Sequence, residues 1–374
     1  MRNDSNLSPC RRKQNGTVDP GVGGRDLAFS VIQAVAICIF ALLTVCGNTL
    51  IILGIIRFRV LQTITSAFIL NLAVVDFLVG VTLMPVALIT CIKQEWILGN
   101  VFCKISGVIN MLFSVASIST LSVIAIDRYC AIIRPLKYAS FMTRRTVAVF
   151  LVWVWGQSLL IALLPLAPWS EYRYDSSELL CLIAWGSTHF SFATLCLFVC
   201  IIVPLGIMFF CYYHILKVAR HHSRRVNALK TISMNSLASN HTLADSDATG
   251  ASGTSGDTRL AIESQSHRCH QPKKPKKVCG AIHVASRENK STAMMMMVVG
   301  TFILAWLPYI TGALCKVIAS ECLWPKSYFT VCVLVAMLQS SLNPIIYGVM
   351  DRRFRGAMKA IVMCSKRAAV DCDG

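Results

Sequence analysis

Residues 105–129 read ISGVINMLFSVASISTLSVIAIDRY, in which a run without a single charge leads into the charged triplet Asp127-Arg128-Tyr129. A helix needs roughly 20 consecutive apolar residues to cross a bilayer, and the run from Ile105 to Ile126 is long enough. An ion pair is expensive in hydrocarbon unless it lies at an interface or works inside a helical bundle. The stretch therefore predicts a membrane span that ends in a functional charged site.

Six other stretches of the chain have the same character. Of the 374 residues, 55% are hydrophobic and only 14% are charged, and the mean hydropathy is +0.61, which argues against an ordinary soluble enzyme. The seven stretches are Leu27–Ile56, Ile64–Ile92, Ile105–Ile126, Thr146–Ser170, Leu182–Leu216, Ser291–Leu314 and Ser327–Met350. Seven membrane-length segments are not typical of a soluble protein with buried helices. We predict an all-α membrane protein, a seven-transmembrane helix bundle with a short amphipathic eighth helix.

Basic residues are concentrated after the odd-numbered spans and account for much of the net charge of +18. They include Arg57, Arg59, Arg134, Lys137, Arg144, Arg145, Arg352, Arg353 and Arg355. By the positive-inside rule these segments face the cytoplasm and the N-terminus lies outside, so nucleic acid is not an expected partner. Three glycosylation sequons, at Asn3, Asn6 and Asn15, support an extracellular N-terminal tail.

The predicted organisation follows from these signals. We expect a multi-pass plasma-membrane protein with a glycosylated extracellular tail (1–26), a seven-span domain (27–350), and an amphipathic helix with a short cytoplasmic tail (351–374). Within the span domain, residues 218–290 form a third cytoplasmic loop whose polar composition predicts disorder. The first span is expected to serve as the signal anchor, because no cleavable signal precedes it.

Five cysteines suggest specific chemistry. Cys103 and Cys181 both lie on the predicted outer side, in an oxidising compartment where they could form a disulfide. Cys315 and Cys322 are consistent either with a second, small disulfide ring or with two free thiols. Cys364 follows the amphipathic segment and is a candidate for palmitoylation, with an ordinary free thiol as the alternative.

The spans carry motifs that together resemble those of the rhodopsin-like (class A) G-protein-coupled receptors. In chain order they are Gly47-Asn48, Asn71-Leu72-Ala73-Val74-Val75-Asp76, Cys103, Asp127-Arg128-Tyr129, Trp155, Pro204, Tyr212, Phe302, Trp306-Leu307-Pro308 and Asn343-Pro344-Ile345-Ile346-Tyr347. The resemblance implies a receptor, not an enzyme, that passes an extracellular signal to a heterotrimeric G protein. It also implies arrestin and receptor kinases as partners, with membrane lipids around the bundle.

The resemblance assigns two groups of switch residues. The G-protein coupling and activation switch comprises Asp127, Arg128, Tyr129, Glu288, Tyr212, Asn343, Pro344 and Tyr347. The transmission switch comprises Phe302, Trp306, Pro308 and Pro204, and a proline inside a span removes a backbone hydrogen bond and loosens its helix. An ionic lock between Arg128 and Glu288 is implied for the inactive state, against the alternative that Glu288 is solvated in its charged surroundings.

A polar cluster and a pocket complete the expected site. The cluster consists of Asp76, Ser117, Ser340 and Asn343, and the resemblance implies an allosteric sodium ion there, against a plain hydrogen-bonded cluster. No other cofactor or metal is expected. The pocket is lined by Asn110, Met111, Ser114, Cys196, Trp306, Tyr309 and Val333.

The pocket residues disfavour two classes of ligand. Asn110 stands where the amine receptors of the family have Asp, and Met337 stands where opsins have their retinal lysine. A monoamine or a retinal Schiff base is therefore not expected, and an apolar pocket with few polar groups suits a neutral or lipid-like ligand. The alternatives are an orphan-like receptor that is constitutively active without a small-molecule agonist, and a membrane transporter.

Overall fold

The computed structural model describes residues 20–185, 190–220, 276–318 and 324–363, and over 20–26 and 276–291 it describes the backbone alone. Seven of its helices are long and apolar enough to cross a membrane, which confirms the predicted number of spans. They are Leu27–Arg57 within α1 (Pro20–Arg57), α2 (Ile64–Lys93), α3 (Gly99–Ile133), α5 (Arg144–Leu163), Phe190–Arg220, α8 (Lys276–Ile318) and α9 (Lys326–Met350). The shorter helices are η1 (Arg59–Leu61), α4 (Pro135–Phe141), η2 (Leu164–Leu166) and α10 (Arg352–Val362).

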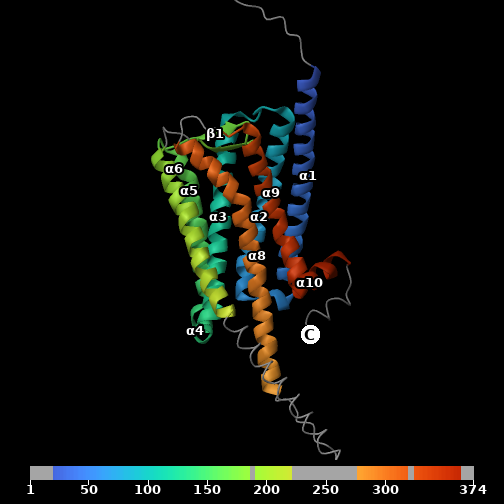
Figure 1. Ribbon diagram of the computed structural model, residues 1–374, viewed down its shortest axis with the longest axis vertical. Helices are drawn as coiled ribbons and strands as arrows, with labels where there is room; N and C mark the ends of the chain where they lie inside the picture. The colour runs from blue at the N-terminus through green and yellow to red at the C-terminus, as the bar shows by residue number, and fades with distance from the viewer. Residues whose placement is uncertain (1–19, 186–189, 221–275, 319–323, 364–374) are drawn as a thin grey trace, which may run out of the picture.

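The helices form one bundle around α3 (Figure 1). This helix packs against α2, α5 and α8, whereas α1 packs mainly against α2 and α9 at the side of the bundle. In the most apolar window of α3, 61% of the residues are buried inside the protein, compared with 17% for the first span. Polar side chains on α3 are therefore in a position to contact several other spans at once.

Local sequence sets where several helices begin. Thr63 and Thr143 occupy the positions before α2 and α5, and each side chain accepts a hydrogen bond from a backbone N–H in the first turn, as capping residues do. Asp351 caps α10 in the same way, through the backbone N–H of Arg353. Because α10 also buries Phe354 against Tyr347, with ring centroids 5.6 Å apart, the predicted amphipathic eighth helix is confirmed.

Between the fourth and fifth spans lies a β-hairpin that the sequence did not indicate. β1 (Tyr172–Asp175) pairs antiparallel with β2 (Leu180–Ile183), and the predicted disulfide between Cys103 and Cys181 ties β2 to α3. The expected fourth span, to Ser170, and the expected fifth span, from Leu182, were therefore both too long. An apolar, uncharged run does not distinguish a buried strand from a helix.

The hairpin is seated on α3 by a close approach at Gly107. A Cβ atom placed on this glycine would collide with the ring of Tyr172, so only a glycine leaves room for the ring. The Tyr172 hydroxyl donates a hydrogen bond to the carbonyl of Ala162 at 2.7 Å, near the end of α5. The hairpin thus occupies a defined position between two spans.

The helix Phe190–Arg220, which we call span five, is irregular in its first half. It begins as α6 (Phe190–Cys196), continues as the π-helix η4 (Leu197–Ile202), and is α-helical over 203–220. Short π-helical segments inside α-helices occur frequently at functional sites. Here the π-helix turns Cys200 and Ile201 toward the interior of the bundle, where both line a cavity.

The two ends of the bundle differ in what they carry. Figure 1 places β1 at one end and α4 and α10 at the other. We call the first the hairpin end and the second, where Asp127-Arg128-Tyr129 lies beside α4, the triplet end.

Candidate functional site

The triplet forms a compact hydrogen-bonded network at the end of α3. Arg128 pairs with Asp127, with its Nη2 at 2.6 Å and its Nε at 3.0 Å from the same carboxylate oxygen, Oδ2. Thr65 on α2 donates its hydroxyl hydrogen to that oxygen at 2.8 Å, and Arg128 also contacts the Thr65 hydroxyl. The Asp127 side chain is fully buried and that of Arg128 is 13% exposed, so the pair is largely shielded from water.

Tyr138 on α4 completes the network from the other side. Its hydroxyl donates a hydrogen bond to the second oxygen of Asp127, Oδ1, at 2.7 Å. Burial, together with the negative charge of Asp127, raises the pKa of Tyr138 to about 12, so the phenol keeps its proton and remains a donor. Thr65 and Tyr138 were not singled out in the sequence, because neither lies in the triplet motif.

Around this network the structure positions the other predicted switch residues. The Tyr129 ring packs against Phe210 and His214 of span five, at centroid distances of 5.8 and 6.1 Å. The hydroxyls of Tyr212 and Tyr347 are buried and have no hydrogen-bond partner in the described part of the chain. Such hydroxyls are available to water or to a rearranged partner.

The predicted lock to Glu288 cannot be placed, because that side chain lies outside the described residues. In the structure Arg128 faces Asp127 and α2 instead. The sequons at Asn3, Asn6 and Asn15, Cys364, and most of the loop 218–290 also lie outside the described residues.

Part of the predicted polar cluster lies in the middle of the bundle. Asn343 donates its amide to Asp76 at 2.7 Å, and both side chains are buried. The amide oxygens of Asn48 and Asn343 are buried without a partner in the described part of the chain. A carboxylate near unpartnered amide oxygens suits a sodium ion, which oxygen ligands bind, or a water molecule, which can donate to them. Ser117 and Ser340 line the cavity next to this cluster.

The transmission residues form a continuous aromatic contact on α8. Phe302 stacks on Trp306 at 5.7 Å between centroids, and Trp306 meets Tyr309 edge to face at 5.8 Å. Pro308 lies between them in sequence, and its carbonyl accepts a hydrogen bond from Tyr328 of α9 at 2.6 Å. On span five, the carbonyl of Pro204 accepts a 3.5 Å hydrogen bond from Ser122 of α3.

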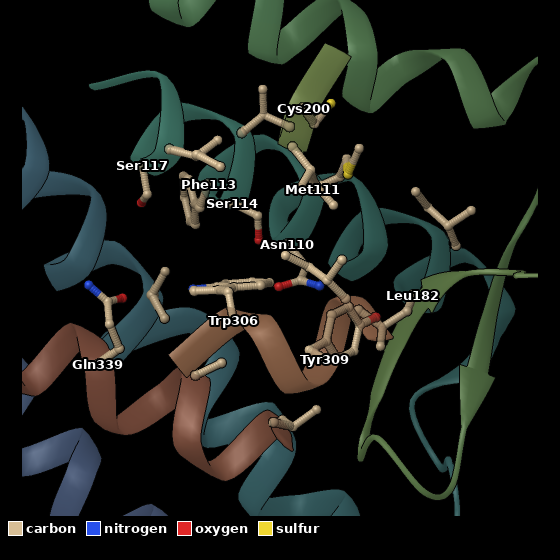
Figure 2. A pocket seen from close by; sticks show the side chains of 18 of the residues that line it. Asn110, Met111, Phe113, Ser114, Ser117, Leu182, Cys200, Trp306, Tyr309 and Gln339 are labelled. Atoms are coloured by element: carbon tan, nitrogen blue, oxygen red, sulfur yellow. The ribbon is translucent and has the colours of Figure 1, made fainter. Parts of the chain in front are cut away.

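A cavity of about 190 Å³ lies around Trp306, lined by the hairpin residue Leu182 and by Ser340 next to the polar cluster. All seven predicted pocket residues line the cavity. Figure 2 shows Asn110, Ser114 and Ser117 following one another along α3, with Trp306 of α8 facing them and Gln339 on α9. None of its lining residues carries a charge. The hairpin adds apolar side chains that the sequence analysis missed, and these are Leu180, Leu182 and Ile183.

The turn of the hairpin, residues 176–179, leads directly into the cavity residue Leu180. Ser177, Glu178 and Leu179 are all buried. Thr90 of α2 donates to the Leu179 carbonyl at 2.6 Å, and Thr330 of α9 donates to the Ser177 carbonyl at 2.7 Å. The turn is therefore bonded to helices on two sides of the bundle.

An ion-pair network attaches the same turn to α8. Lys316 lies 2.9 Å from Asp175 and 2.5 Å from Glu178, and Tyr309 donates its hydroxyl to Glu178 at 3.0 Å. Burial raises the pKa of Glu178 although Lys316 opposes it, whereas hydrogen bonds from Ser177 and Lys316 outweigh burial and lower the pKa of Asp175. Because Tyr309 also contacts Trp306, the hairpin is linked to the transmission residues.

Sequence reasoning missed this network for an identifiable reason. Lys316 lies just beyond the stretch expected to form the sixth span, and Asp175 and Glu178 lie between the stretches expected to form the fourth and fifth spans. A basic residue at the end of an apolar helix was the available signal. Nearby, Cys315 is disulfide-bonded, and Cys322, which the sequence suggested as its partner, lies outside the described residues.

The seven spans, the motifs along them and the central cavity define a seven-transmembrane receptor. A family model described as 7 transmembrane receptor (rhodopsin family) matches residues 47–347, and the chain therefore belongs to this family. Membership sets the transporter alternative aside. It also makes the chain a multi-pass membrane protein of the receptor type.

Individual relatives agree with this assignment. G-protein coupled receptor 161 of Homo sapiens is 29% identical over 360 residues, which are 95% of this chain and 63% of that protein. Octopamine receptor beta-2R of Drosophila melanogaster is 28% identical over 341 residues, 89% of this chain and 61% of that receptor. The chain thus spans less than two thirds of the length of these relatives.

A solved structure shows the same arrangement of helices. The crystal structure of squid rhodopsin is matched with a TM-score of 0.70 and 25% identity, over 92% of this chain and 90% of that one. The likeness therefore extends over nearly the whole molecule and is not confined to a few spans.

Proposed function

We propose that this receptor carries an extracellular signal across the plasma membrane and activates a heterotrimeric G protein at its triplet end. The observation that carries the proposal is Arg128, a largely buried cation held at the end of a central span by Asp127 and Thr65. Breaking those bonds would free the guanidinium for a partner protein. Pro308 inside α8 supplies a point at which that helix can pivot.

The proposed orientation has the hairpin end outside the cell. The disulfide between Cys103 and Cys181 supports it, because disulfides persist in oxidising compartments. The basic residues of the triplet end, among them Arg134, Arg144 and Arg352, support it through the positive-inside rule. The sequons of the N-terminal tail would then be accessible to glycosylation.

Nucleotide exchange on purified G proteins tests the proposal directly. The receptor in nanodiscs should accelerate exchange on at least one G-protein subtype, and Arg128→Ala should abolish the acceleration. Glu288→Ala should raise basal exchange if the proposed lock exists. Absence of exchange with every subtype would contradict the proposed function, and unchanged basal exchange in Glu288→Ala would contradict the lock alone.

The ligand proposed for the cavity is neutral. A protonated amine such as octopamine, for which one relative is named, would need a carboxylate partner when removed from water, and no lining residue of the cavity is charged. Asn110 offers an amide instead. Measuring exchange with and without lipid extract and with amines at the same concentrations would test this, because stimulation by amines alone would contradict it.

A second candidate is a receptor with high basal activity and no small-molecule agonist. It is favoured by the hairpin, whose own residues Leu180, Leu182 and Ile183 already fill part of the cavity wall. Exchange that is high in delipidated receptor and is unchanged by every addition would favour this candidate.

Regulation by ions and partners is proposed by analogy with the family. Sodium near Asp76 should lower basal exchange, and an absence of any sodium effect in the wild type would remove the ion from the proposal. Arrestin and receptor kinases are proposed to act on the Ser/Thr-rich third loop, for example around Ser233, Ser236, Ser239 and Ser246. Deleting residues 231–265 should reduce arrestin recruitment.

Cys364 is proposed as a palmitoylation site, which mass spectrometry of the intact tail would test.

A further inference from the structure

We propose that the cavity takes a neutral amphiphilic lipid that enters sideways from the membrane, between span five and α8, and not from the aqueous side. This deepens the proposed function by naming the chemical class of the ligand and its route. Four observations carry it: unpartnered polar groups, the absence of charge, a hairpin fastened to several helices, and a thin wall toward the lipid.

The first observation is a set of polar side chains that face the cavity and have no partner. Asn110, Ser114 and Gln339 line it, and none makes a side-chain hydrogen bond to another described residue. The indole N–H of Trp306 is also buried without a partner in that part of the chain. Buried polar groups are costly when unpaired, so these groups would be satisfied by a bound molecule with hydroxyl, carbonyl or amide atoms.

The second observation concerns charge and size. The lining has no ionisable acid or base that would balance a charged head group, so a phosphate, carboxylate or ammonium is disfavoured. The cavity, about 190 Å³, is smaller than the roughly 300–1,000 Å³ of sites that enclose a drug-sized ligand. A long-chain molecule would therefore place its polar head inside and leave part of its tail outside the cavity.

The third observation is that the hairpin is fastened to several helices at the end of the bundle that we propose faces the aqueous phase. The turn is bonded to Thr90 and Thr330, and Lys316 fastens it to α8. Leu179 has a positive φ of 58°, which a bulky side chain adopts only where the surroundings fix it. Displacing the turn would require several hydrogen bonds and ion pairs to break together.

The fourth observation is the wall between span five and α8. In the described part of the chain, α8 packs extensively against α9 but scarcely against α6 or η4. Leu307 lines the cavity and is also 50% exposed on the outside of the bundle, so a single side chain separates the two. Ile201 and Leu205 form the facing side on span five. We call these three residues the lateral wall.

Together these features orient the ligand. The polar head would lie beside Asn110, Ser114 and Trp306, which Figure 2 shows around the same space. The apolar tail would pass between Leu307 and Ile201 and remain in contact with membrane lipid. Contact of the head with Trp306 would then couple occupancy to the transmission residues.

Photolabelling in nanodiscs tests the route. The probe is a long-chain monoacylglycerol that carries a diazirine and an alkyne on its chain, and labelled peptides are identified by mass spectrometry. We expect saturable labelling of cavity residues in the wild type. Unlabelled monoacylglycerol should compete, and the same chain ending in a primary amine should not.

Matched variants separate the lateral route from the aqueous one. Leu307→Trp should slow labelling at least fivefold, and Leu307→Ala should accelerate it. Leu304→Trp is the control, because Leu304 lies on the same helix and is 71% exposed but does not line the cavity. Lys316→Met, which loosens the hairpin turn, should leave the rate of labelling within twofold of the wild type.

The outcomes are distinct. Equal effects of Leu307→Trp and Leu304→Trp, or a large acceleration by Lys316→Met alone, would overturn the lateral route. Absence of saturable labelling in the cavity, or competition by the amine as strong as that by the neutral lipid, would overturn the ligand class. Basal nucleotide exchange, measured without the probe, reports on the proposed receptor function separately.

Discussion

The hairpin end and the triplet end each contain a buried carboxylate beside a cation, but the pairs join different things. At the hairpin end, Lys316 on α8 pairs with Asp175 and Glu178, more than 130 residues earlier in the chain. At the triplet end, Arg128 pairs with its neighbour Asp127 on the same helix. The first arrangement fastens α8 to a loop, whereas the second stores a cation within α3.

This difference indicates where movement is possible. None of the described side chains of α8 is bonded to Arg128, and Pro308 separates the fastened end of α8 from the rest. A helix that is held at one end and contains an internal proline can swing at the other. The comparison therefore predicts that substitutions at the triplet end change signalling, whereas those at the hairpin end change stability with little effect on signalling.

The largest effect is expected for Arg128→Ala. Removing the stored cation should lower G-protein nucleotide exchange more than tenfold, and it should also lower the thermal stability, because the buried Asp127 carboxylate keeps, among the described residues, only Thr65 and Tyr138 as hydrogen-bond donors. Arg144→Ala is the matched control, since Arg144 is an exposed basic residue at the same end. Retained nucleotide exchange in Arg128→Ala would contradict the proposed difference between the triplet end and the hairpin end.

At the hairpin end, Lys316→Met should have the largest effect on stability. It leaves the buried Glu178 carboxylate without its cation, and breaking a buried pair typically costs about 3–5 kcal/mol, less here because Lys316 is 18% exposed. We expect a drop of several degrees in Tm, measured by thermal unfolding in detergent. Lys326→Met, an exposed lysine with no ion pair in the described part of the chain, should leave Tm unchanged.

Tyr138→Phe should sharpen the comparison by acting on signalling alone. It removes one hydrogen bond to the charged Asp127 carboxylate, worth about 1.5–3 kcal/mol, so that the carboxylate depends more on Arg128 and release of Arg128 becomes harder. Basal exchange should therefore fall severalfold. Tyr213→Phe, at a 56% exposed position, is the control. A rise in basal exchange would contradict the storage role.

The smallest effect is expected for Asp175→Asn. Its carboxylate is 39% exposed, and ion pairs accessible to water contribute less than about 1 kcal/mol. Glu178→Gln, whose side chain is 2% exposed, should change Tm more than Asp175→Asn. Equal shifts in Tm would mean that the two carboxylates contribute equally to the interaction with Lys316.

Much of this architecture could be predicted from the sequence because it depends on local runs and short motifs. Seven apolar lengths set the spans, and the residues expected to line the pocket and the polar cluster on α3, Asn110, Ser114 and Ser117, all line the cavity. The hairpin could not be predicted, because an uncharged apolar run around Leu182 is compatible with strand or helix. The attachment of Glu178 to Lys316 depends on how a loop folds back over the bundle, which no local pattern encodes.

The fit of Tyr172 against Gly107 has a consequence for engineering this receptor. The ring of Tyr172 on the hairpin packs directly against Gly107 of α3, and the Tyr172 hydroxyl reaches the end of α5. A chimera that received this hairpin in a scaffold with a larger residue at position 107 would have to displace the ring and the strand that bears it. The hairpin and its glycine should therefore be exchanged as one unit.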